Sequence, residues 1–532
     1  MSKDDAKKGK ILIVTGFPTE GAGSGALIST QAKSYVKMGY DVEIITANNR
    51  TDFDKIDGVK YVLVPFTGEG ENPEKIEGQL PFNYPMFTTH TESTENYWKS
   101  TKENMDMYRE KYKEVINKEV ERFKPDVIHG QHVSIVSSLC VDTNVPTVVT
   151  VHGTGLMAYE RSKKEIEKID EKLKDKDLDK MERAHLIDEK EKYQGYIKDA
   201  DNAVKKAKKI IVISKDQKSR FLKMFGDKNP GLEEKTTLEV NGYDEEVFYK
   251  DKEHKTTREE AFEGLKAINT EDGKIPLDYD SMSLFVGKFA DFKGIDASLD
   301  AFKKAHDELK KQNKKHIFVI VGSGALNDKL QKQVKKLNIE DVYFVGKQKH
   351  ETIRKLHQVA SEAIVNSRHE PDGLVVKEAM ATGDPILGSN DAGVGETVNT
   401  EKKDLPQGKM HVTPVGVLVS ALPDRPSSLS DDQKEILDDA THLYTFGNTD
   451  YAMGVAGKLG LGEESAKKYF EVYKRNVDEQ AQAMEDIALG KITFDKDENA
   501  NYAKSRFSQD VVSSNYIKIF EEASGKKLDF ER

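Results

Sequence analysis

Short runs of apolar, β-prone residues recur along the chain, each followed by a loop and a stretch of helix-forming residues. In the first half, the run over residues 10–15 precedes a glycine-rich loop, a helical stretch over about 26–38 that ends at Gly39, and a second apolar run over 41–46. Strand, loop, helix and strand in this order form a βαβ unit. The pattern therefore predicts an α/β protein with a doubly wound parallel sheet in this half.

A second series of apolar runs begins near residue 283, after a polar stretch near 247–280. It continues through residues 316–322, 342–346, 363–365, 385–388 and 416–419. Two such series predict two similar domains that face a cleft. Ligands of doubly wound sheets bind at the carboxyl ends of the strands, so we expect the functional residues in the loops that follow them.

Two segments depart from the strand–helix alternation. Residues 159–209 are rich in Lys, Glu and Asp, with sparse apolar positions at Ile166, Ile169, Leu173, Leu186 and Ile197. This spacing predicts a charged helical insertion, a hairpin with a narrow apolar stripe and a solvated outer face. An ordinary solvated insertion, a cap over a substrate pocket and a contact in a homo-oligomer all remain open. Residues 423–462 are interpreted as a second surface insertion.

Composition narrows the class of protein. The chain has 532 residues, enough for two domains, and its net charge of -11 argues against a general nucleic-acid binder. The sequence has no transmembrane-length apolar run and its N-terminus lacks the apolar stretch of a secretory signal, so we expect a soluble, cytoplasmic protein. Cys140 is the single cysteine, which excludes an intrachain disulfide and a thiolate zinc cluster.

The most informative stretch lies at residues 368–383, where Glu370 and Glu378 are separated by seven residues. Pro371 disfavours helical geometry at Glu370, whereas Gly373 permits a turn that leads into a helix over 374–381. The first N–H groups of such a helix lack intrahelical partners and attract a phosphate or pyrophosphate. Carboxylates on both sides of an anion site suit a nucleotide-sugar, which has hydroxyls on both sides of its diphosphate.

This stretch resembles the E-x7-E signature of retaining glycosyltransferases of family 4 (group 1), which are related to glycogen and starch synthases and have the GT-B fold. Most of the family string E-P-x-G-L-x-x-x-E-A-M-A-x-G-x-P is present, although Asp372 stands where the family usually has an uncharged residue. The resemblance implies an acceptor-side Rossmann-like domain over residues 1–247 and a nucleotide-sugar-binding Rossmann-like domain over 248–505. It also implies that residues 506–532 form a helix that crosses back to the N-terminal domain.

Further motifs follow in the family's order. Residues 285–294 resemble the element V-G-R-x-x-x-x-K-G, which implies that Lys288 and Lys293 hold the donor diphosphate. Residues 321–324 resemble the element V-G-x-G. In the resulting assignment Glu378 accepts the ribose hydroxyls and Glu370 binds sugar hydroxyls. The backbone at Gly373, Leu374, Val375, Gly322 and Gly324 contacts the donor.

The N-terminal half contributes a histidine and a loop. His152 ends an apolar run, and the resemblance places it against the donor sugar near its reacting end. The loop with Gly21, Gly23 and Gly25 resembles the family's first glycine loop, which approaches the sugar and the acceptor. His129, His132 and His369 show no metal-ligand spacing, although His369 is a candidate contact for the sugar. We therefore expect no metal and no cofactor besides the nucleotide-sugar substrate.

The sequence thus predicts a retaining, metal-independent hexosyltransferase that moves a sugar from a nucleoside-diphosphate sugar, with a UDP-linked donor favoured, to a hydroxyl acceptor. The acceptor stays open among a glycan, a polyol, a protein and a lipid headgroup. Two alternatives also stay open: a GT-B sugar-nucleotide epimerase, and a catalytically silent sugar-nucleotide-binding or scaffold protein.

Overall fold

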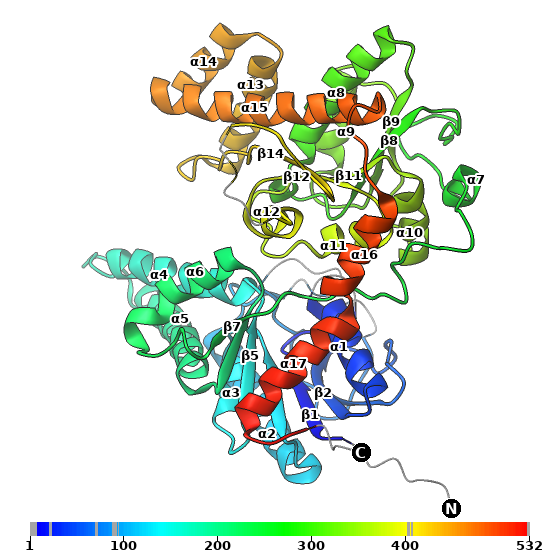
Figure 1. Cartoon of the computed structure of the whole chain (residues 1–532). Coiled ribbons are helices and arrows are strands. Elements are labelled where there is room, and N and C mark those ends of the chain that lie inside the picture. Colours follow the sequence, from blue (N-terminus) through cyan, green and yellow to red (C-terminus); the bar gives the residue numbers. More distant parts are fainter. Residues whose placement is uncertain are drawn as a thin grey trace, which may run out of the picture. The chain divides into compact units, whose positions relative to one another are not determined.

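The computed structural model describes residues 8–20, 24–69, 73–87, 93, 95–401, 405 and 408–528. The chain forms two compact units, one made of Met1–Gly242 with Gln509–Arg532 and the other of Tyr243–Ser508 (Figure 1). Each unit contains its own seven-stranded sheet with helices on both faces. The prediction of an α/β chain with two doubly wound sheets is confirmed.

The sheet of the first unit is parallel throughout, in the strand order β3-β2-β1-β4-β5-β6-β7. The order reverses between β1 and β4, and ligands of doubly wound sheets bind at such a switch point. The strands are β1 Lys10–Val14, β2 Asp41–Asn48, β3 Val59–Pro65, β4 Val127–Gln131, β5 Thr147–Val151, β6 Lys209–Val212 and β7 Thr236–Leu238.

Helices cover both faces of this sheet, because its central strands carry apolar side chains on both sides. The helices are α1 Ser24–Lys37, α2 Lys102–Phe123, α3 Ile135–Val141, α4 Thr154–Lys172, α5 Lys180–Lys206, α6 Lys215–Phe225 and α17 Gln509–Ser524, with the 3₁₀ turn η1 Gly226–Lys228. On one face, α1 and α17 pack together; on the other, α2 to α6 share a large apolar core. The last helix of the chain therefore completes the core of the first unit.

The charged insertion forms the antiparallel pair α4 and α5. Asp179 caps α5 by accepting hydrogen bonds from the N–H groups of Met181 and Glu182. Ile169 and Leu186 are buried in the core of the unit, and the other three predicted positions, Ile166, Leu173 and Ile197, are partly buried against it. The narrow stripe thus attaches the hairpin to the domain. Outside the stripe its surface carries alternating charges, such as the pair between Lys190 and Asp170 (Nζ to Oδ1, 2.5 Å).

The sheet of the second unit has the order β10-β9-β8-β11-β12-β14-β13. Its strands are β8 Ser281–Val286, β9 His316–Val321, β10 Val342–Phe344, β11 Glu362–Val365, β12 Ile386–Ser389, β13 His411–Thr413 and β14 Gly416–Val419. Only β13 is antiparallel to its neighbour, since it joins β14 through a hairpin too short for a parallel crossover. This edge strand was not predicted from the sequence.

The helices of the second unit are α7 Arg258–Phe262, α8 Ile295–Lys311, α9 Asn327–Lys336, α10 His350–Val359, α11 Leu374–Ala381, α12 Ala392–Val398, α13 Asp431–Thr445, α14 Thr449–Lys458, α15 Glu463–Ala488 and α16 Lys496–Phe507, with the 3₁₀ turn η2 Asp291–Lys293. The long helix α15 lies along α8 (Figure 1). Residues 423–462, interpreted as a surface insertion, instead build a helical subdomain. In it, α13 and α14 share an apolar core with the first half of α15.

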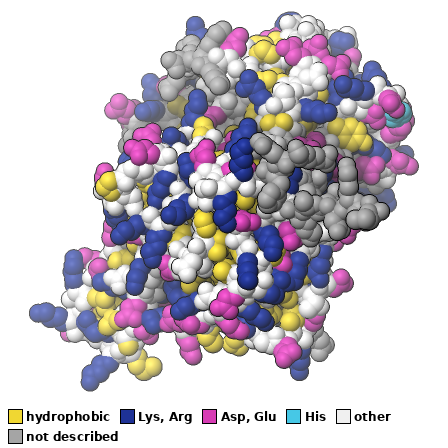
Figure 2. Space-filling view, turned by 60° about the horizontal axis from the view of Figure 1, so that its bottom comes forward, with side chains coloured by type: hydrophobic (Ala, Val, Ile, Leu, Met, Phe, Trp, Pro, Cys, Tyr) yellow, Lys and Arg dark blue, Asp and Glu magenta, His cyan; other side chains and the backbone are white. Residues whose placement is uncertain are grey.

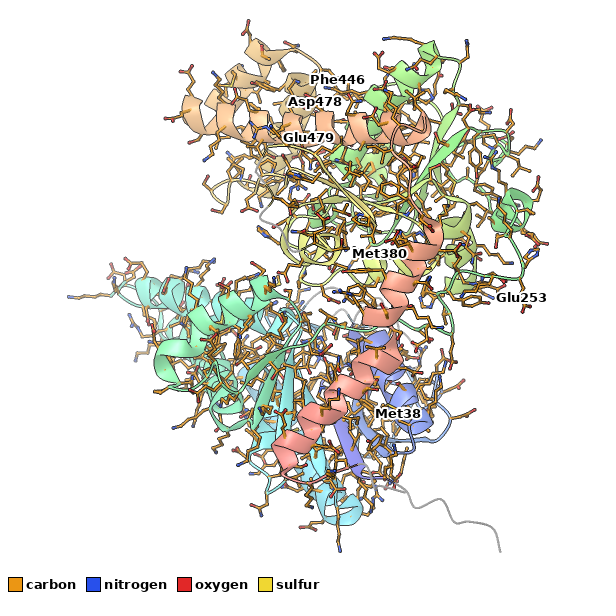
Figure 3. The ribbon with its side chains drawn as sticks, viewed as in Figure 1. Met38, Glu253, Met380, Phe446, Asp478 and Glu479 are labelled. Atoms are coloured by element: carbon orange, nitrogen blue, oxygen red, sulfur yellow. The ribbon has the colours of Figure 1, made fainter. Side chains whose placement is uncertain are left out.

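Side chains at the surface are mixed in charge. In the view of Figure 2, Lys and Arg side chains alternate with Asp and Glu side chains, as expected for 82 basic and 93 acidic residues. Figure 3 shows examples on the second unit, where Phe446 lies on the helical subdomain and Asp478 lies on α15. Lys304 of α8 contacts both, with its Nζ 2.6 Å from Asp478 Oδ1 and 5.4 Å from the ring centre of Phe446. Of the helices in the described residues, none is long and apolar enough to cross a membrane.

Candidate functional site

The predicted anion site is built from the loop between β11 and α11. Gly373 adopts a left-handed conformation (φ 71°, ψ 62°) and leads directly into α11, which begins at Leu374 as the sequence predicts. A side chain at Gly373 would be strained in this conformation and crowd Val376 (3.1 Å). The loop is also held from α12, because Gly393 N–H donates to the carbonyl oxygen of Glu370 (2.9 Å). In the first turn of α11, Val376 N–H donates to the Gly373 carbonyl oxygen (2.9 Å), which leaves the first two N–H groups of the helix suited to an anion at this end.

Two predicted site residues from different loops contact each other. The ammonium of Lys293, at the end of η2, forms an ion pair with the carboxylate of Glu370. Both side chains are mostly buried, at 16% and 15% exposure. The ammonium has three donors, so it can keep Glu370 as a partner and still donate to a phosphate oxygen. The geometry therefore places a cation and a carboxylate side by side, next to the N-terminus of α11.

Lys288 lies on the loop that follows β8 and leads to Lys293, and it is exposed to solvent. The loop backbone is held against the loop after β9, with Phe289 N–H donating to the Ser323 carbonyl oxygen (2.9 Å). Gly322 and Gly324 make this close approach feasible. A Cβ atom built on Gly322 would lie 1.8 Å from the carbonyl oxygen of Gly287, and one on Gly324 would lie 2.4 Å from that of Phe289. The two glycines thus bring two site loops together; a contact with a donor stays a prediction.

The second glutamate of the motif, Glu378, lies on α11 and is half-buried. Its pKa is raised to about 7, first by burial and then by the nearby negative charge of Asp244. Asp244 lies at the beginning of the second unit, and its carbonyl oxygen accepts hydrogen bonds from the N–H groups of Val247 (3.1 Å) and Phe248 (2.8 Å). Asp244 was not singled out from the sequence as a neighbour of Glu378.

Asp372 departs from the uncharged residue of the family pattern, and an uncompensated carboxylate would repel a diphosphate. In the structure its carboxylate is instead paired with Lys377, whose side chain is fully buried. The ammonium of Lys377 also lies 5.4 Å from the ring centre of Phe507. Because the pair is internally neutral, Asp372 does not present an uncompensated negative charge to an anion. Sequence reasoning missed Lys377, because a spacing of five residues across the start of a helix is not a recognised pairing signal.

His369, the candidate sugar contact beside Glu370, is bound to other parts of the second unit. It adopts a positive φ of 54°, and its N–H donates to Asp391 Oδ2 (2.7 Å). Its ring Nε2 lies 2.9 Å from Asp424 Oδ1, in the segment that leads to the helical subdomain. Through these contacts His369 holds the loop between β11 and α11 in place.

In the first unit, His152 follows β5 and is held by Gln131 from the end of β4. His152 Nε2 lies 2.7 Å from Gln131 Oε1, and its ring centre lies 4.8 Å from that of His132. Gln131 Nε2 in turn lies 3.2 Å from His129, whose Nε2 is 2.7 Å from Thr150 Oγ1. This chain of contacts fixes the orientation of the His152 ring. Gln131 was not singled out from the sequence.

Burial keeps these three histidines uncharged at neutral pH. The pKa of His129 is lowered to about 3 and that of His132 to about 4, both by burial. The pKa of His152 is lowered well below its usual value by burial and by the two neighbouring rings. An uncharged His152 can donate or accept a hydrogen bond with a sugar hydroxyl.

The predicted first glycine loop is only partly described, because Gly21 and Gly23 lie outside the described residues. Gly25 lies in the first turn of α1, where a Cβ atom would be 2.7 Å from the carbonyl oxygen of Pro18. No group of three His, Cys, Asp or Glu side chains within the described ranges is arranged to hold a metal ion.

Comparison with known structures identifies the class of fold. Sucrose-phosphate synthase from Thermosynechococcus elongatus aligns over 97% of this chain and 98% of its own, with a TM-score of 0.54 and 15% identity. HepE from Anabaena, in complex with UDP and glucose, aligns over 96% and 98% with a TM-score of 0.50 and 13% identity. The two doubly wound units therefore have the GT-B fold.

Comparison of sequences finds similar proteins for part of the chain. Residues 269–419 match glycosyl transferases group 1. An uncharacterised glycosyltransferase of Methanocaldococcus jannaschii is 30% identical over 193 residues, 36% of this chain and 45% of that protein. Glycogen synthase of Mycobacterium tuberculosis is 33% identical over 116 residues, 22% of this chain and 27% of that enzyme. The matches span less than half the length of these relatives.

Residues 269–419 are thus similar to the group 1 glycosyltransferases, with a distant similarity to glycogen synthases. The resemblance stated from the sequence is confirmed. The matched region contains the ion pair of Lys293 with Glu370, the loop with Gly322 and Gly324, and helix α11.

Proposed function

We propose that this protein is a retaining glycosyltransferase that moves a hexose from a nucleoside-diphosphate sugar to a hydroxyl acceptor without a bound metal. The observation that carries the proposal is the pairing of Lys293 with Glu370 beside the N-terminus of α11. A cation at a helix N-terminus suits a departing diphosphate, and an adjacent carboxylate suits the hydroxyls of its sugar. We assign donor binding to the unit Tyr243–Ser508 and acceptor binding to the other unit.

In this proposal the bond between the anomeric carbon and the diphosphate oxygen breaks as the acceptor oxygen bonds to the same face of the sugar. The acceptor proton goes to the leaving phosphate. Lys288, Lys293 and the N–H groups of residues 373–375 stabilise the negative charge that develops on the diphosphate. Glu378 accepts hydrogen bonds from the ribose hydroxyls. His152, held by Gln131, contributes a hydrogen bond to the donor sugar.

A UDP-linked donor is the favoured case. HepE, whose structure was determined with UDP and glucose, has the same fold, and that likeness supports a UDP-sugar as the first candidate here. The test is incubation of the full chain with separate UDP-, ADP- and GDP-hexoses, scored for release of the nucleotide. We expect release with one class of donor, accelerated by an acceptor from a crude extract of the host. Mass spectrometry of the labelled product then identifies the acceptor. Failure of all donors to bind or react would contradict the proposal.

Two other functions give different results in this assay. A sugar-nucleotide epimerase would convert the donor into an isomer without an acceptor, and a silent binding or scaffold protein would bind UDP tightly without turnover. The ion pair between Asp372 and Lys377 weighs against the silent alternative, because it neutralises the carboxylate that departs from the family pattern.

A further inference from the structure

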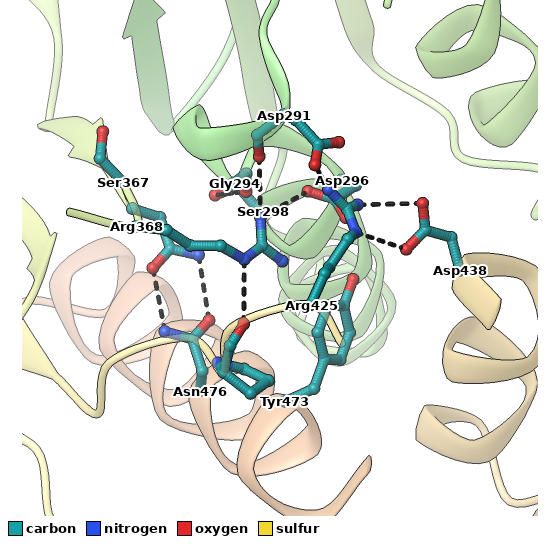
Figure 4. A network of polar contacts seen from close by, with 12 residues as sticks. Asp291, Gly294, Asp296, Ser298, Ser367, Arg368, Arg425, Asp438, Tyr473 and Asn476 are labelled. Carbon is teal, nitrogen blue, oxygen red and sulfur yellow. Dashed lines mark hydrogen bonds and ion pairs between the residues drawn. The ribbon is translucent and has the colours of Figure 1, made fainter. Parts of the chain in front are cut away.

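The turn that carries Lys293 is held by a buried arginine from the loop that carries Glu370 (Figure 4). Arg368 N–H donates to the carbonyl oxygen of Phe292 (2.6 Å), and its Nη1 donates to that of Asp291 (2.8 Å). Its Nε donates to the carbonyl oxygen of Pro423 (3.2 Å). With 6% exposure, Arg368 is an interior clamp that fixes two successive carbonyl groups next to Lys293.

A second arginine reaches the same turn from the segment that leads into the helical subdomain. Arg425 forms an ion pair with the carboxylate of Asp291, and its side chain is only 7% exposed. Its Nε and Nη2 atoms each donate to Asp438 of α13 at 2.9 Å. This two-pronged contact fixes the plane of the guanidinium, as a lysine could not. Arg425 therefore ties the turn to α13.

The two guanidinium groups converge on the first turn of α8. Asp296 lies 3.3 Å from Arg425 Nη2 and 3.9 Å from Arg368 Nη1. Behind them, Asn366 of the Glu370 loop exchanges hydrogen bonds with Asn476 of α15 (2.9 and 3.0 Å). Gly294 closes the turn, and a Cβ atom there would lie 2.1 Å from the carbonyl oxygen of Asn366. The turn is thus enclosed by α8, the Glu370 loop and the helical subdomain.

We propose that Arg368 and Arg425 are positioning residues for Lys293, and that the helical subdomain serves the transfer reaction by supplying Arg425 and its partner Asp438. The inference rests on the proposed function for its catalytic consequence. Lysine has a long side chain with many rotamers, so its ammonium can meet a diphosphate reproducibly only if the backbone beneath it is fixed. Both arginines act on that backbone or on its neighbour Asp291, and neither is assigned a contact with substrate.

The test compares Arg425→Met and Arg425→Lys with wild type in the full chain. Lys304→Met is the matched control, since Lys304 on α8 contacts α15 through Asp478 (2.6 Å) and the helical subdomain through the Thr445 carbonyl oxygen (3.1 Å). We expect Arg425→Met to lower kcat by about 10- to 100-fold with a smaller change in KM, because misplacement of a catalytic cation weakens transition-state contacts most. Arg425→Lys should recover only part of the loss, and Lys304→Met should stay near wild type.

A second readout does not depend on sugar transfer. Trace acetylation followed by peptide mass spectrometry measures the reactivity of the Lys293 ammonium. In Arg425→Met this reactivity should rise several-fold relative to Lys303, because the turn loosens and the pair with Glu370 weakens. If Arg425→Met fails to fold, Arg425→Lys must show the same change in smaller measure. Unchanged reactivity of Lys293, or equal losses of kcat in Arg425→Met and Lys304→Met, would overturn the inference.

The two proposals fail in different ways. A wild-type chain that neither binds nor uses any nucleotide-sugar would refute the proposed function. It would also remove the catalytic role proposed for Arg368 and Arg425. A wild-type chain that transfers sugar while Arg425→Met does so equally well would refute the positioning role of Arg425 and leave the proposed function standing.

Discussion

Asp372 and Lys377 form an ion pair at the beginning of α11, with Asp372 5% exposed and Lys377 fully buried. Each charge would be costly on its own in this environment, and together they give a neutral unit next to the proposed anion site. The pair explains how a carboxylate at a position that the family leaves uncharged is compatible with a diphosphate nearby.

This pair allows a test on stability. Asp372→Asn should destabilise the protein by about 3 kcal/mol, because it leaves a buried ammonium without its counter-charge. The double variant Asp372→Leu, Lys377→Met should recover most of that loss. Urea unfolding measures both, and a double variant as unstable as the single one would show that the pair contributes more than charge compensation.

Lys293 is expected to be essential for transfer. Lys293→Ala should reduce kcat/KM at least ~10²-fold, because a preorganised cation next to the leaving diphosphate is lost. The control is Lys303→Ala, which removes a cation of α8 that pairs with Asp307 and does not touch the site loops. Steady-state nucleotide release measures both variants, and a Lys293→Ala enzyme with wild-type rates would refute the assignment.

The raised pKa of Glu378 leads us to expect that kcat/KM depends on pH. With its pKa raised to about 7 by burial and by Asp244, its carboxyl is largely neutral below pH 7 and ionised above it. The ionised form accepts hydrogen bonds from a cis-diol better, so kcat/KM should rise between about pH 6 and pH 8. Glu378→Ala should lose at least ~10²-fold in activity. Glu378→Gln should lack the rise with pH, and an unchanged pH profile in that variant would exclude Glu378 as its source.

The raised pKa of Glu362 leads us to expect that the stability of the fold also depends on pH. It is fully buried at the start of β11, and burial, followed by the nearby Asp384, raises its pKa to about 8. The folded state therefore keeps this proton up to about pH 8, whereas the unfolded chain releases it above its ordinary pKa of 4.5. The protonated Glu362 carboxyl therefore contributes fully to the free energy of unfolding below pH 4.5. This contribution is lost as the pH rises towards 8, because in that range the folded state binds more protons than the unfolded state.

The measurement is urea unfolding of Glu362→Gln at pH 5 and pH 8. Glutamine resembles the protonated carboxyl, so the variant should gain roughly 1–3 kcal/mol relative to wild type between the two pH values. Glu351→Gln, at an exposed glutamate of α10, is the control and should show no such gain. Equal pH dependence in wild type and Glu362→Gln would contradict the assignment.

The close packing at Gly322 leads us to expect that a side chain there destabilises the fold. Gly322→Ala should destabilise the protein by about 2 kcal/mol or more, because its Cβ would overlap the carbonyl oxygen of Gly287 and its φ of 137° disfavours a side chain. Gly454→Ala is the matched control, since that glycine lies on α14 with open space around it and should gain about 0.5–1 kcal/mol. Thermal unfolding compares the two, and a stable Gly322→Ala would mean that the two loops move apart at little cost.

Much of the fold could be predicted from the sequence because the signals are local. Pro371 and Gly373 mark the turn before α11, and the helix begins and ends where the residues 374–381 suggest. The buried parallel strands appear as apolar runs, since both of their faces are covered. By contrast, β13 is too short to stand out. The apolar core of α13 and α14 was hidden because its partner, α15, lies further along the chain.

The site divides in the same way. Sequence alone determined that Lys293, Glu370 and Glu378 lie in loops or helices after strands, because backbone sterics and burial are decided within a few residues. The tertiary structure decided that Lys293 meets Glu370 across 77 positions, that Asp244 lies near Glu378, and that two arginines support the turn. These contacts depend on strand order and register, which bring the ends of non-adjacent segments to one edge of a sheet. No local pattern contains that information.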